Sequence, residues 1–382
     1  MAFLTFARPD ITEAEIEAVT HAMRSGWLTT GPNAVAFERE FAEFLGTDSH
    51  AVALNSATAG LHLAFEAIGI GPGDEVLVPT WTFTATAEAV RYLDGDPVMV
   101  DVDPHTLCID LEDAERKVTE RTVAIAPVHF AGLGVPNRAL TDFARRHGLK
   151  VIEDAAHSFP TLNEGALIGT HGHTATVYSF YATKTMTTGE GGMVITPDAD
   201  LAARMRKMRL HGIDRDVFDR YTSTKPSWHY DVVAPGYKYN LTDTAAAMGR
   251  VQLQRTPEMV AKRTSIADRF TEALADLPLI LPARAPEGSS HAWHIYNIRL
   301  TDDAPVGRDR FIELMAEQEV GTSVHFIPLH LHPYWRDTYH LTPEDFPVAT
   351  EQFKRACSLP IFSAMTDDEV DQVISAVRSI LG

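Results

Sequence analysis

One lysine follows the end of an apolar run and lies among residues too small to cover it. The stretch from 179 to 194 reads SFYATKTMTTGEGGMV, so Ser179 ends the run and Lys184 comes five residues later. An amine with threonines and glycines around it can act as a nucleophile or carry a proton, because its neighbours leave room for a ligand. Lys184 is therefore the first candidate for a catalytic group.

Two further apolar runs end in polar groups. Ser56, Ala57 and Thr58 follow HAVALN and open a helical pattern, so their N–H groups could bind a phosphate. The same residues are also typical of ordinary helix capping. Asp154 ends VIED and His157 follows three residues later. A buried carboxylate is costly unless it faces a positive group, such as a protonated ring nitrogen, although a helix cap is the alternative here.

The elements that must position these groups alternate between strand-like and helix-like patterns. Apolar runs such as EVLVP, PVMVDVD and LKVIEDAA are separated by helical patterns such as SATAGLHLAFEAIGI and RALTDFARRHG. This alternation predicts an α/β fold with a largely parallel sheet that is covered on both faces. Ligands of such sheets bind beyond the carboxyl ends of the strands, where the three groups of polar residues would meet.

The sequence pattern changes towards the C-terminal third of the chain. Residues 1–254 are expected to form a large domain, and residues 255–382 a smaller α+β domain that contains HIYNIRL, FIELMAEQ and DEVDQVISAVRSIL. Within the large domain, residues 211–239 are expected to form a long irregular segment of a kind that is usually functional or disordered. Its basic residues could meet a diphosphate or could only solvate a loop; they are Arg215, Arg220 and Lys225.

Pyridoxal phosphate is the cofactor whose needs match these groups. It requires a lysine for a Schiff base, an acid facing the pyridinium nitrogen, phosphate donors and a flat group against the ring. Lys184 would be the Schiff-base lysine and Asp154 the acid, while Ser179 and the helix start at Ser56–Thr58 would bind the phosphate. Phe83, in PTWTFTAT, could stack on the ring, although a phenylalanine after a strand is also typical of plain core.

The motifs at these residues resemble those of the DegT/StrS-type sugar aminotransferases. They are EDAAHS, the Ser-x4-Lys of SFYATK, GEGG, SGWLTTGP and CSLPIF, and the resemblance runs from about residue 5 to residue 380. It implies an aspartate-aminotransferase-like (fold type I) large domain with a mainly parallel seven-stranded sheet, a small C-terminal domain, and a homodimer with shared active sites. It also implies specific roles: Lys184 as Schiff-base lysine and general base, Asp154 opposite the ring nitrogen, His157 beside the ring, Ala57, Thr58 and Ser179 at the phosphate, and Phe83 at the stacking position.

One motif departs from the usual family pattern. Many members read GYNYRM where this chain reads GYKYNL, so Lys238 stands where an asparagine usually reaches the neighbouring subunit's cofactor phosphate. Asn240 stands where arginine is common, and either residue could touch phosphate or lie only on the surface. The variant, together with SGWLTTGP, NSATAG and HAWH, is similar to the ArnB branch of the family. The resemblance places three residues at the substrate: Trp27, Thr29 and His330.

Composition excludes several classes of partner. The formal net charge is -19, which argues against nucleic acid or an anionic membrane surface. The N-terminus MAFLTFARPD lacks the apolar core of a signal peptide, and the two cysteines form no disulfide framework, so we expect a cytoplasmic protein without a membrane partner. His325, His330 and His332 lie close in sequence but lack the flanking carboxylates of a metal site, and we expect no metal.

The implied reaction is amination of a nucleotide-linked keto-sugar by glutamate, which becomes 2-oxoglutarate. Lys184 would take a proton from the donor carbon and later deliver one to the sugar carbon. The ArnB-like motifs favour carbon 4, whereas FIPLHLHPYW is closer to the general family. A TDP- or UDP-linked 4-keto-6-deoxyhexose is therefore the expected substrate, with a UDP-4-keto-pentose or amination at carbon 3 as alternatives. Relatives that dehydrate sugars replace the lysine by histidine, and a non-catalytic regulator would not need Lys184, Asp154 and Ser179 together.

Overall fold

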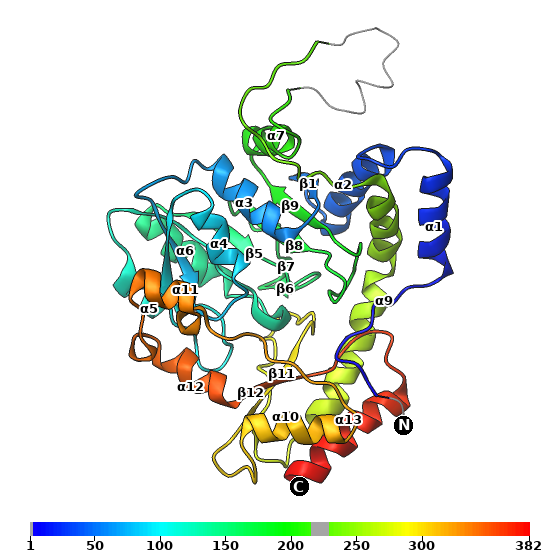
Figure 1. Cartoon of the computed structure of the whole chain (residues 1–382), viewed down its shortest axis with the longest axis vertical. Helices are drawn as coiled ribbons and strands as arrows, with labels where there is room; N and C mark the ends of the chain where they lie inside the picture. The colour runs from blue at the N-terminus through cyan, green and yellow to red at the C-terminus, as the bar shows by residue number, and fades with distance from the viewer. Residues whose placement is uncertain (1–2, 215–228) are drawn as a thin grey trace.

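A seven-stranded sheet forms the centre of the computed structural model, which describes residues 3–214 and 229–382 (Figure 1). The spatial order of its strands is β1-β9-β8-β5-β4-β2-β3. Only β9 runs antiparallel to its neighbours β1 and β8, and the other pairs are parallel. The strands are β1 (His50–Leu54), β2 (Glu75–Pro79), β3 (Asp96–Val100), β4 (Thr122–Ile125), β5 (Lys150–Asp154), β8 (Ala175–Ser179) and β9 (Gly192–Thr196). The expected α/β fold with a mainly parallel sheet is confirmed.

Helices cover both faces of this sheet. Successive side chains of a strand point to opposite faces, so Val177 and Tyr178 of β8 contact different layers. On one face α3 (Ala57–Ala67) lies so close that a Cβ atom on Gly60 would be 2.7 Å from Cγ1 of Val177. On the other face, Phe41 of α2 (Pro32–Leu45) lies with its ring 5.2 Å from that of Tyr178. The sheet is therefore buried on both sides, which explains its continuous apolar strands.

Further elements complete the large domain. α1 (Glu13–Arg24) begins with a capping box between Thr12 and Glu15, and α6 (Asn137–His147) ends at Gly148 with a φ of 68°. The other short elements of this part of the chain are α4 (Ala85–Arg91), α5 (Leu111–Lys117), η1 (Phe130–Gly132), β6 (Leu162–Asn163), β7 (Ala166–Leu167) and α7 (Ala199–Met208).

A long helix, α9 (Asp243–Ala273), connects the large sheet to the C-terminal part (Figure 1). It begins at Thr242, whose hydroxyl accepts from the N–H of Ala245. Its first half packs against α1 and α2, while Ile266 and Phe270 in its second half belong to a separate hydrophobic core. The expected division between residues 254 and 255 falls inside this continuous helix and stays a prediction.

The smaller sheet is antiparallel and belongs to that second core. It consists of β10 (Leu279–Ile280), β11 (Tyr296–Leu300) and β12 (Ala356–Leu359), and α10 (Arg308–Glu317) and α13 (Asp367–Leu381) pack against it. Leu4 also joins this core through a bridge to Val320, so the N-terminal residues lie with the C-terminal part.

The connection between β11 and β12 returns to the large sheet. Leu329, Trp335 and Phe346 belong to the core of the large domain, and the N–H of Leu329 donates to the carbonyl of Thr80, directly after β2. This connection contains η2 (Leu329–Leu331), α11 (Pro333–Tyr339), η3 (Pro343–Asp345) and α12 (Pro347–Arg355). Residues 320–330 thus pass close to the carboxyl edge of the large sheet.

Candidate active site

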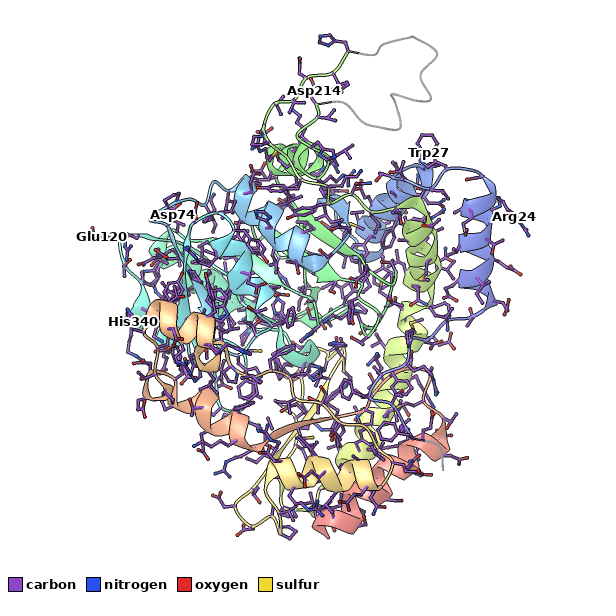
Figure 2. All side chains as sticks on the ribbon, in the orientation of Figure 1. Arg24, Trp27, Asp74, Glu120, Asp214 and His340 are labelled. Atoms are coloured by element: carbon purple, nitrogen blue, oxygen red, sulfur yellow. The ribbon has the colours of Figure 1, made fainter. Side chains whose placement is uncertain are left out.

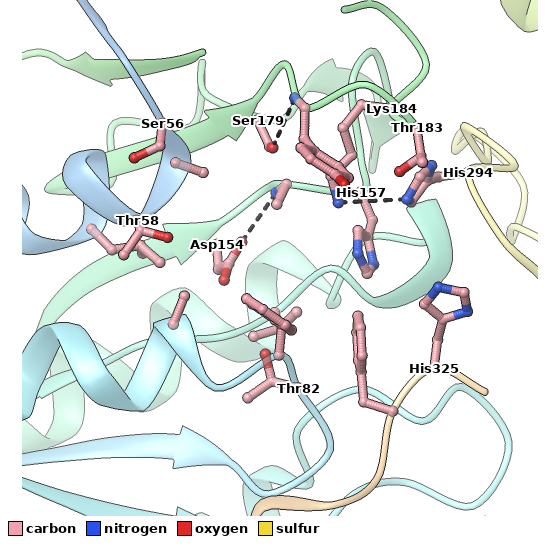
Figure 3. A pocket seen from close by; sticks show the side chains of 18 of the residues that line it. Ser56, Thr58, Thr82, Asp154, His157, Ser179, Thr183, Lys184, His294 and His325 are labelled. Carbon is pink, nitrogen blue, oxygen red and sulfur yellow. Dashed lines mark hydrogen bonds between the residues drawn. The ribbon is translucent and has the colours of Figure 1, made fainter. Parts of the chain in front are cut away.

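A cavity of about 450 Å³ lies at the carboxyl ends of β1, β2, β5 and β8 (Figure 3). These four strands run in the same direction, so their ends meet at one edge. The cavity brings together every residue expected at the cofactor except Lys238 and Asn240. Its lining consists of Ser56, Ala57, Thr58, Leu61, Thr82, Phe83, Ala85, Val128, Asp154, Ala156, His157, Ser179, Tyr181, Thr183, Lys184, Glu190, Gly191, His294, His325 and Phe326.

The start of α3 forms one end of the cavity. The Ser56 hydroxyl accepts from the N–H of Ala59 at 3.1 Å, so Ser56 caps the helix. Among the described residues, nothing accepts from the N–H groups of Ala57 and Thr58. Ser179, at the end of β8, lines the same cavity. Capping and anion binding are therefore compatible here, because the cap leaves two N–H donors of the helix start free for a phosphate.

Asp154 lies buried at the end of β5. Its carboxylate accepts from the hydroxyl of Thr86 at 2.8 Å and from the N–H of Ala156 at 3.1 Å. Burial raises the pKa of this carboxyl, and the two hydrogen bonds and the charge of Lys184 only partly oppose that effect. No ion pair to Asp154 occurs within residues 3–214 and 229–382. A protonated pyridine nitrogen would supply the positive partner that this carboxylate lacks, so the donor set fits pyridoxal phosphate.

The amine of Lys184 lies deep in the same cavity. Burial lowers its pKa to about 8, although the charge of Asp154 acts in the opposite direction. Nζ lies 3.5 Å from Nε2 of His294, within hydrogen-bonding distance. An amine with this pKa is unprotonated in roughly a tenth of molecules at pH 7, far more than an ordinary lysine, and a nucleophile and general base requires that form.

Three histidines face the amine and remain uncharged. Burial lowers the pKa of His157 and of His294 well below the usual value, and it lowers the pKa of His325 to about 4; the charge of Lys184 adds to each shift. The rings of His157 and His294 lie 4.6 Å apart, and Nδ1 of His157 accepts from the N–H of Ala131. The site therefore offers neutral imidazoles beside a single amine.

Phe83 lines the cavity instead of filling the core. Its side chain is 58% exposed, and its ring lies 5.8 Å from that of Phe326. An aromatic ring exposed in an enclosed site is available to pack against a flat ligand. Stacking on the cofactor ring stays a prediction for Phe83.

Four residues expected at the cofactor or the substrate do not line the cavity. Lys238 is exposed, and Nδ2 of Asn240 donates to the hydroxyls of Thr30 at 2.8 Å and Thr29 at 3.4 Å. Nε1 of Trp27 donates to the carbonyl of Thr30, and Figure 2 shows Trp27 on the outside of the molecule beside α2. Asn240, Trp27 and Thr29 lie together at the α1–α2 connection, whereas the carbonyl of Lys238 accepts from Nδ2 of Asn55; none of the four residues lines the cavity of its own chain.

His330 also lies away from the cavity, contrary to the expectation that it contacts the sugar. It is fully buried: Nδ1 lies 2.8 Å from the hydroxyl of Thr80, and Nε2 lies 2.9 Å from that of Thr350. Its ring stacks on Phe346. Both nitrogens are thus occupied by the protein, and the histidine of this stretch that lines the cavity is His325.

Several residues of the site were not expected from the sequence. Thr86 binds Asp154 from α4, and His294 contacts Lys184 from a segment 110 residues away. The HAWH motif includes His294 and was a signal for it, but periodicity gave no indication that His325 and Phe326 would line the cavity. No group of three or more histidine, cysteine or acidic residues that could hold a metal ion exists in the described part of the chain. Arg215, Arg220 and Lys225, which could meet a diphosphate or only solvate a loop, lie outside the described residues.

Comparisons with known proteins identify the same chemistry. Residues 9–378 match the model of the DegT/DnrJ/EryC1/StrS aminotransferase family. Spore coat polysaccharide biosynthesis protein SpsC of Bacillus subtilis is 45% identical over 99% of this chain and 97% of its own. The PLP form of Spr1654 from Streptococcus pneumoniae, classed as a sugar aminotransferase, is 30% identical, with a TM-score of 0.91 over 100% of both chains. The aminotransferase TlmJ of Streptoalloteichus hindustanus is 32% identical, with a TM-score of 0.89 over 98% of each chain.

Proposed function

The chain belongs to the DegT/DnrJ/EryC1/StrS aminotransferase family and is a pyridoxal-phosphate-dependent sugar aminotransferase, and from this we propose that it transfers an amino group from glutamate to the carbon-4 ketone of a nucleotide-linked keto-sugar. The proposed sugar is a TDP- or UDP-linked 4-keto-6-deoxyhexose. The observation that supports the proposal most directly is the single cavity in which Lys184, Asp154 and the start of α3 meet.

The cavity residues have distinct roles in the proposed reaction. Bound pyridoxal phosphate supplies an electron-withdrawing ring that stabilises the charge left when a carbon beside nitrogen loses its proton. Asp154 would keep the ring nitrogen protonated, and the N–H groups of Ala57 and Thr58, with the hydroxyl of Ser179, would hold the phosphate. Lys184 would hold the cofactor, and its free amine would take a proton from the donor carbon and deliver one to the sugar carbon.

Two substrate alternatives remain within the proposal. The GYKYNL and HAWH motifs support a UDP-4-keto-pentose, as in the ArnB branch, and amination at carbon 3 also occurs in the family. The relative SpsC is by its name a protein of spore coat polysaccharide biosynthesis, which supports a product that serves as a polysaccharide building block.

We also propose a homodimer in which each active site uses both chains. Lys238, Asn240, Trp27 and Thr29 lie outside the cavity of their own chain, so a partner is needed to bring them to a cofactor or a sugar. Exposed apolar side chains of α1, the α1–α2 connection and α2 would be covered by such a partner; they are Ile16, Met23, Leu28 and Val35.

We also propose that the protein is cytoplasmic. Cys108 and Cys357 are both free and buried, as is common in a reducing compartment. In the described part of the chain, no helix has the length and apolar character to cross a membrane.

A substrate panel tests the proposal directly. Purified protein is incubated with glutamate and a set of nucleotide-linked 4-keto and 3-keto sugars, and the products are identified by mass spectrometry and NMR. We expect a 4-amino sugar and 2-oxoglutarate with at least one 4-keto substrate, and no product with Lys184→Ala. Amination of 3-keto sugars alone would contradict the assignment to carbon 4.

A further inference from the structure

A buried histidine lies in the helix whose start would bind the cofactor phosphate. His62 belongs to α3 and is 4% exposed, and burial lowers the pKa of its imidazole, so the ring is neutral near pH 7. Nδ1 lies 3.0 Å from the hydroxyl of Tyr239, and Nε2 is buried without a partner among the described residues. Because a buried polar ring is costly, the contact with Tyr239 is what this histidine provides and an apolar residue would not.

Tyr239 belongs to the segment that is proposed to reach the partner subunit. Residues 237–240 run between the end of β1 and the end of α7. The N–H of Asn55 donates to the carbonyl of Tyr239 at 2.8 Å, and the N–H of Tyr239 donates to the carbonyl of Arg209 at 2.9 Å. These hydrogen bonds hold the backbone of the segment, while separate contacts orient its side chains.

The side chains of this segment lie on two faces. The rings of Tyr237 and Tyr239 stack on each other with centroids 5.0 Å apart, and the ring of Tyr237 lies 4.6 Å from that of His62. Lys238, between the two tyrosines, is exposed, as expected when successive side chains of an extended segment alternate. Holding the two tyrosines against α3 therefore leaves Lys238 on the outward face.

We propose that His62 is a positioning residue for the active site of the partner subunit: its contacts with Tyr237 and Tyr239 hold residues 237–240 so that Lys238 is directed at the partner's cofactor phosphate. This inference rests on the shared active site proposed above. The alternative is a local role, in which His62 only steadies α3 and the phosphate donors of its own chain.

Mixed dimers with a single intact Lys184 separate the two roles. A chain with Lys184→Ala and a chain with Lys184 carry different affinity tags, are co-expressed and are purified as the mixed dimer, so one site alone can attach pyridoxal phosphate. In the first pairing, His62→Phe is in the chain that has Lys184. In the second pairing, it is in the chain that has Lys184→Ala. The absorbance of the attached cofactor gives the affinity of the intact site for pyridoxal phosphate.

We expect His62→Phe to lower this affinity about 3- to 10-fold in the second pairing and to leave it unchanged in the first, because the hydrogen bond is lost on the chain that reaches across. Tyr239→Phe, which removes the other partner of that bond, should act in the same pairing. His62→Asn keeps a polar group near the position of Nδ1 and should restore most of the affinity.

Tyr92→Phe is the matched control for Tyr239→Phe. The ring of Tyr92 lies 5.4 Å from that of His62, but its hydroxyl donates to Glu88 and not to the histidine. Removal of this hydroxyl should leave the affinity for pyridoxal phosphate unchanged in both pairings.

A second measurement needs no cofactor. Hydrogen exchange of the apoprotein, followed by mass spectrometry, should be faster in His62→Phe at the N–H groups of residues 237–240. A local role predicts faster exchange at the start of α3 instead.

Two results would overturn the inference. One is a loss of affinity in the first pairing, which would place the effect of His62 in its own chain. The other is unchanged affinity in both pairings. If His62→Phe does not fold, Tyr239→Phe decides between the same outcomes.

The shared site itself is tested with Lys238→Ala and Asn240→Ala together in the same two pairings. A loss of affinity in the second pairing alone supports the shared site, and any other result refutes it. If these two substitutions act across the dimer while His62→Phe and Tyr239→Phe do not, the inference about His62 fails and the shared site stands.

Discussion

The two ends of the cavity are built in different ways. The cofactor end comes from the ends of parallel strands of one sheet: the start of α3 after β1, Asp154 at the end of β5, Ser179 at the end of β8, and Lys184 after it. The substrate end combines His294, His325 and Phe326 from segments beside the small sheet, and the expected substrate residues Trp27 and Thr29 lie outside the cavity of their own chain. A fixed cofactor can be held by rigid strand ends, whereas two different substrates need groups from parts of the protein that can differ between relatives.

The largest effect is expected at the cofactor end, for Lys184→Ala. Loss of the amine that holds the cofactor and carries the proton should reduce turnover by about 10³-fold or more. Turnover is measured with glutamate and the accepted sugar, and borohydride reduction of the wild type should attach the cofactor to the peptide that contains Lys184. Lys150→Ala, at an exposed lysine, is the control and should keep full activity. Recovery of the label on another lysine would refute the assignment.

Asp154→Asn should give the next largest loss. The amide keeps the shape of the side chain but removes the charge that holds the ring nitrogen protonated, which should cost about 3–4 kcal/mol in the transition state. The variant should still bind cofactor, as measured by absorbance, while kcat falls. Asp142→Asn, at an exposed carboxylate, is the matched control. Near-normal turnover of Asp154→Asn would show that Asp154 only accepts hydrogen bonds from Thr86 and Ala156.

A shared active site predicts that two inactive variants can restore activity together. Lys184→Ala is combined with the double variant Lys238→Ala, Asn240→Ala by unfolding, mixing and refolding. In a mixed dimer one active site would carry all the substitutions and the other would carry none. About half of the dimers are mixed and each has one intact site of two, so activity should return to roughly a quarter of the wild-type value.

The control for this experiment pairs Lys184→Ala with Asp154→Asn. Both residues line the cavity of the same chain, so every site of that mixed dimer carries a lesion and no activity should return. An absence of recovery in the first mixture, with mixed dimers demonstrated by mass spectrometry, would contradict the proposed contribution of the partner.

A smaller effect is expected of pH on the rate at which the apoprotein attaches the cofactor. Because burial lowers the pKa of Lys184 to about 8, the amine loses its proton as pH rises through about 8 and not near the usual 10.5. The rate at which apoprotein attaches added pyridoxal phosphate should therefore increase from pH 6.5 to 9 and then level off. The absorbance change of the cofactor measures this rate. A rate that still rises steeply above pH 9.5 would show that the pKa is not lowered.

The smallest effect on activity is expected for His330→Ala. His330 and His325 belong to the same segment, but only His325 lines the cavity. His330 bonds to Thr80 and Thr350 inside the protein, so its loss should lower the free energy of unfolding by about 1–3 kcal/mol. Thermal unfolding measures that loss, and KM for the sugar should change by less than about 2-fold. An increase in the KM for the sugar without a loss of stability would indicate that His330 contacts the sugar.

The cofactor end could be predicted from the sequence because its signals are local. An apolar strand followed at once by Ser-x-Thr, or by Asp, places these residues at the carboxyl edge of a parallel sheet, whatever the details of the packing. The alternation of strands and helices gave the fold class for the same reason, since burial on both faces requires continuous apolar strands. Whether Ser56 acts as a cap or a ligand is left open by the sequence; in the structure Ser56 caps the helix, and none of the described residues accepts from the N–H groups of Ala57 and Thr58.

The sequence by itself therefore determined the sheet, its order of strand and helix, and the polar groups at its edge, because these depend on periodicity and near neighbours. Only the tertiary structure decided that His325 lines the cavity while His330 is buried, and that Thr86 supports Asp154 from α4. Residues 325 and 330 lie in an irregular connection, where no period determines the direction of a side chain. Their environments depend on which distant segments pack against them: Ser358 beside His325, and Thr80 and Thr350 beside His330.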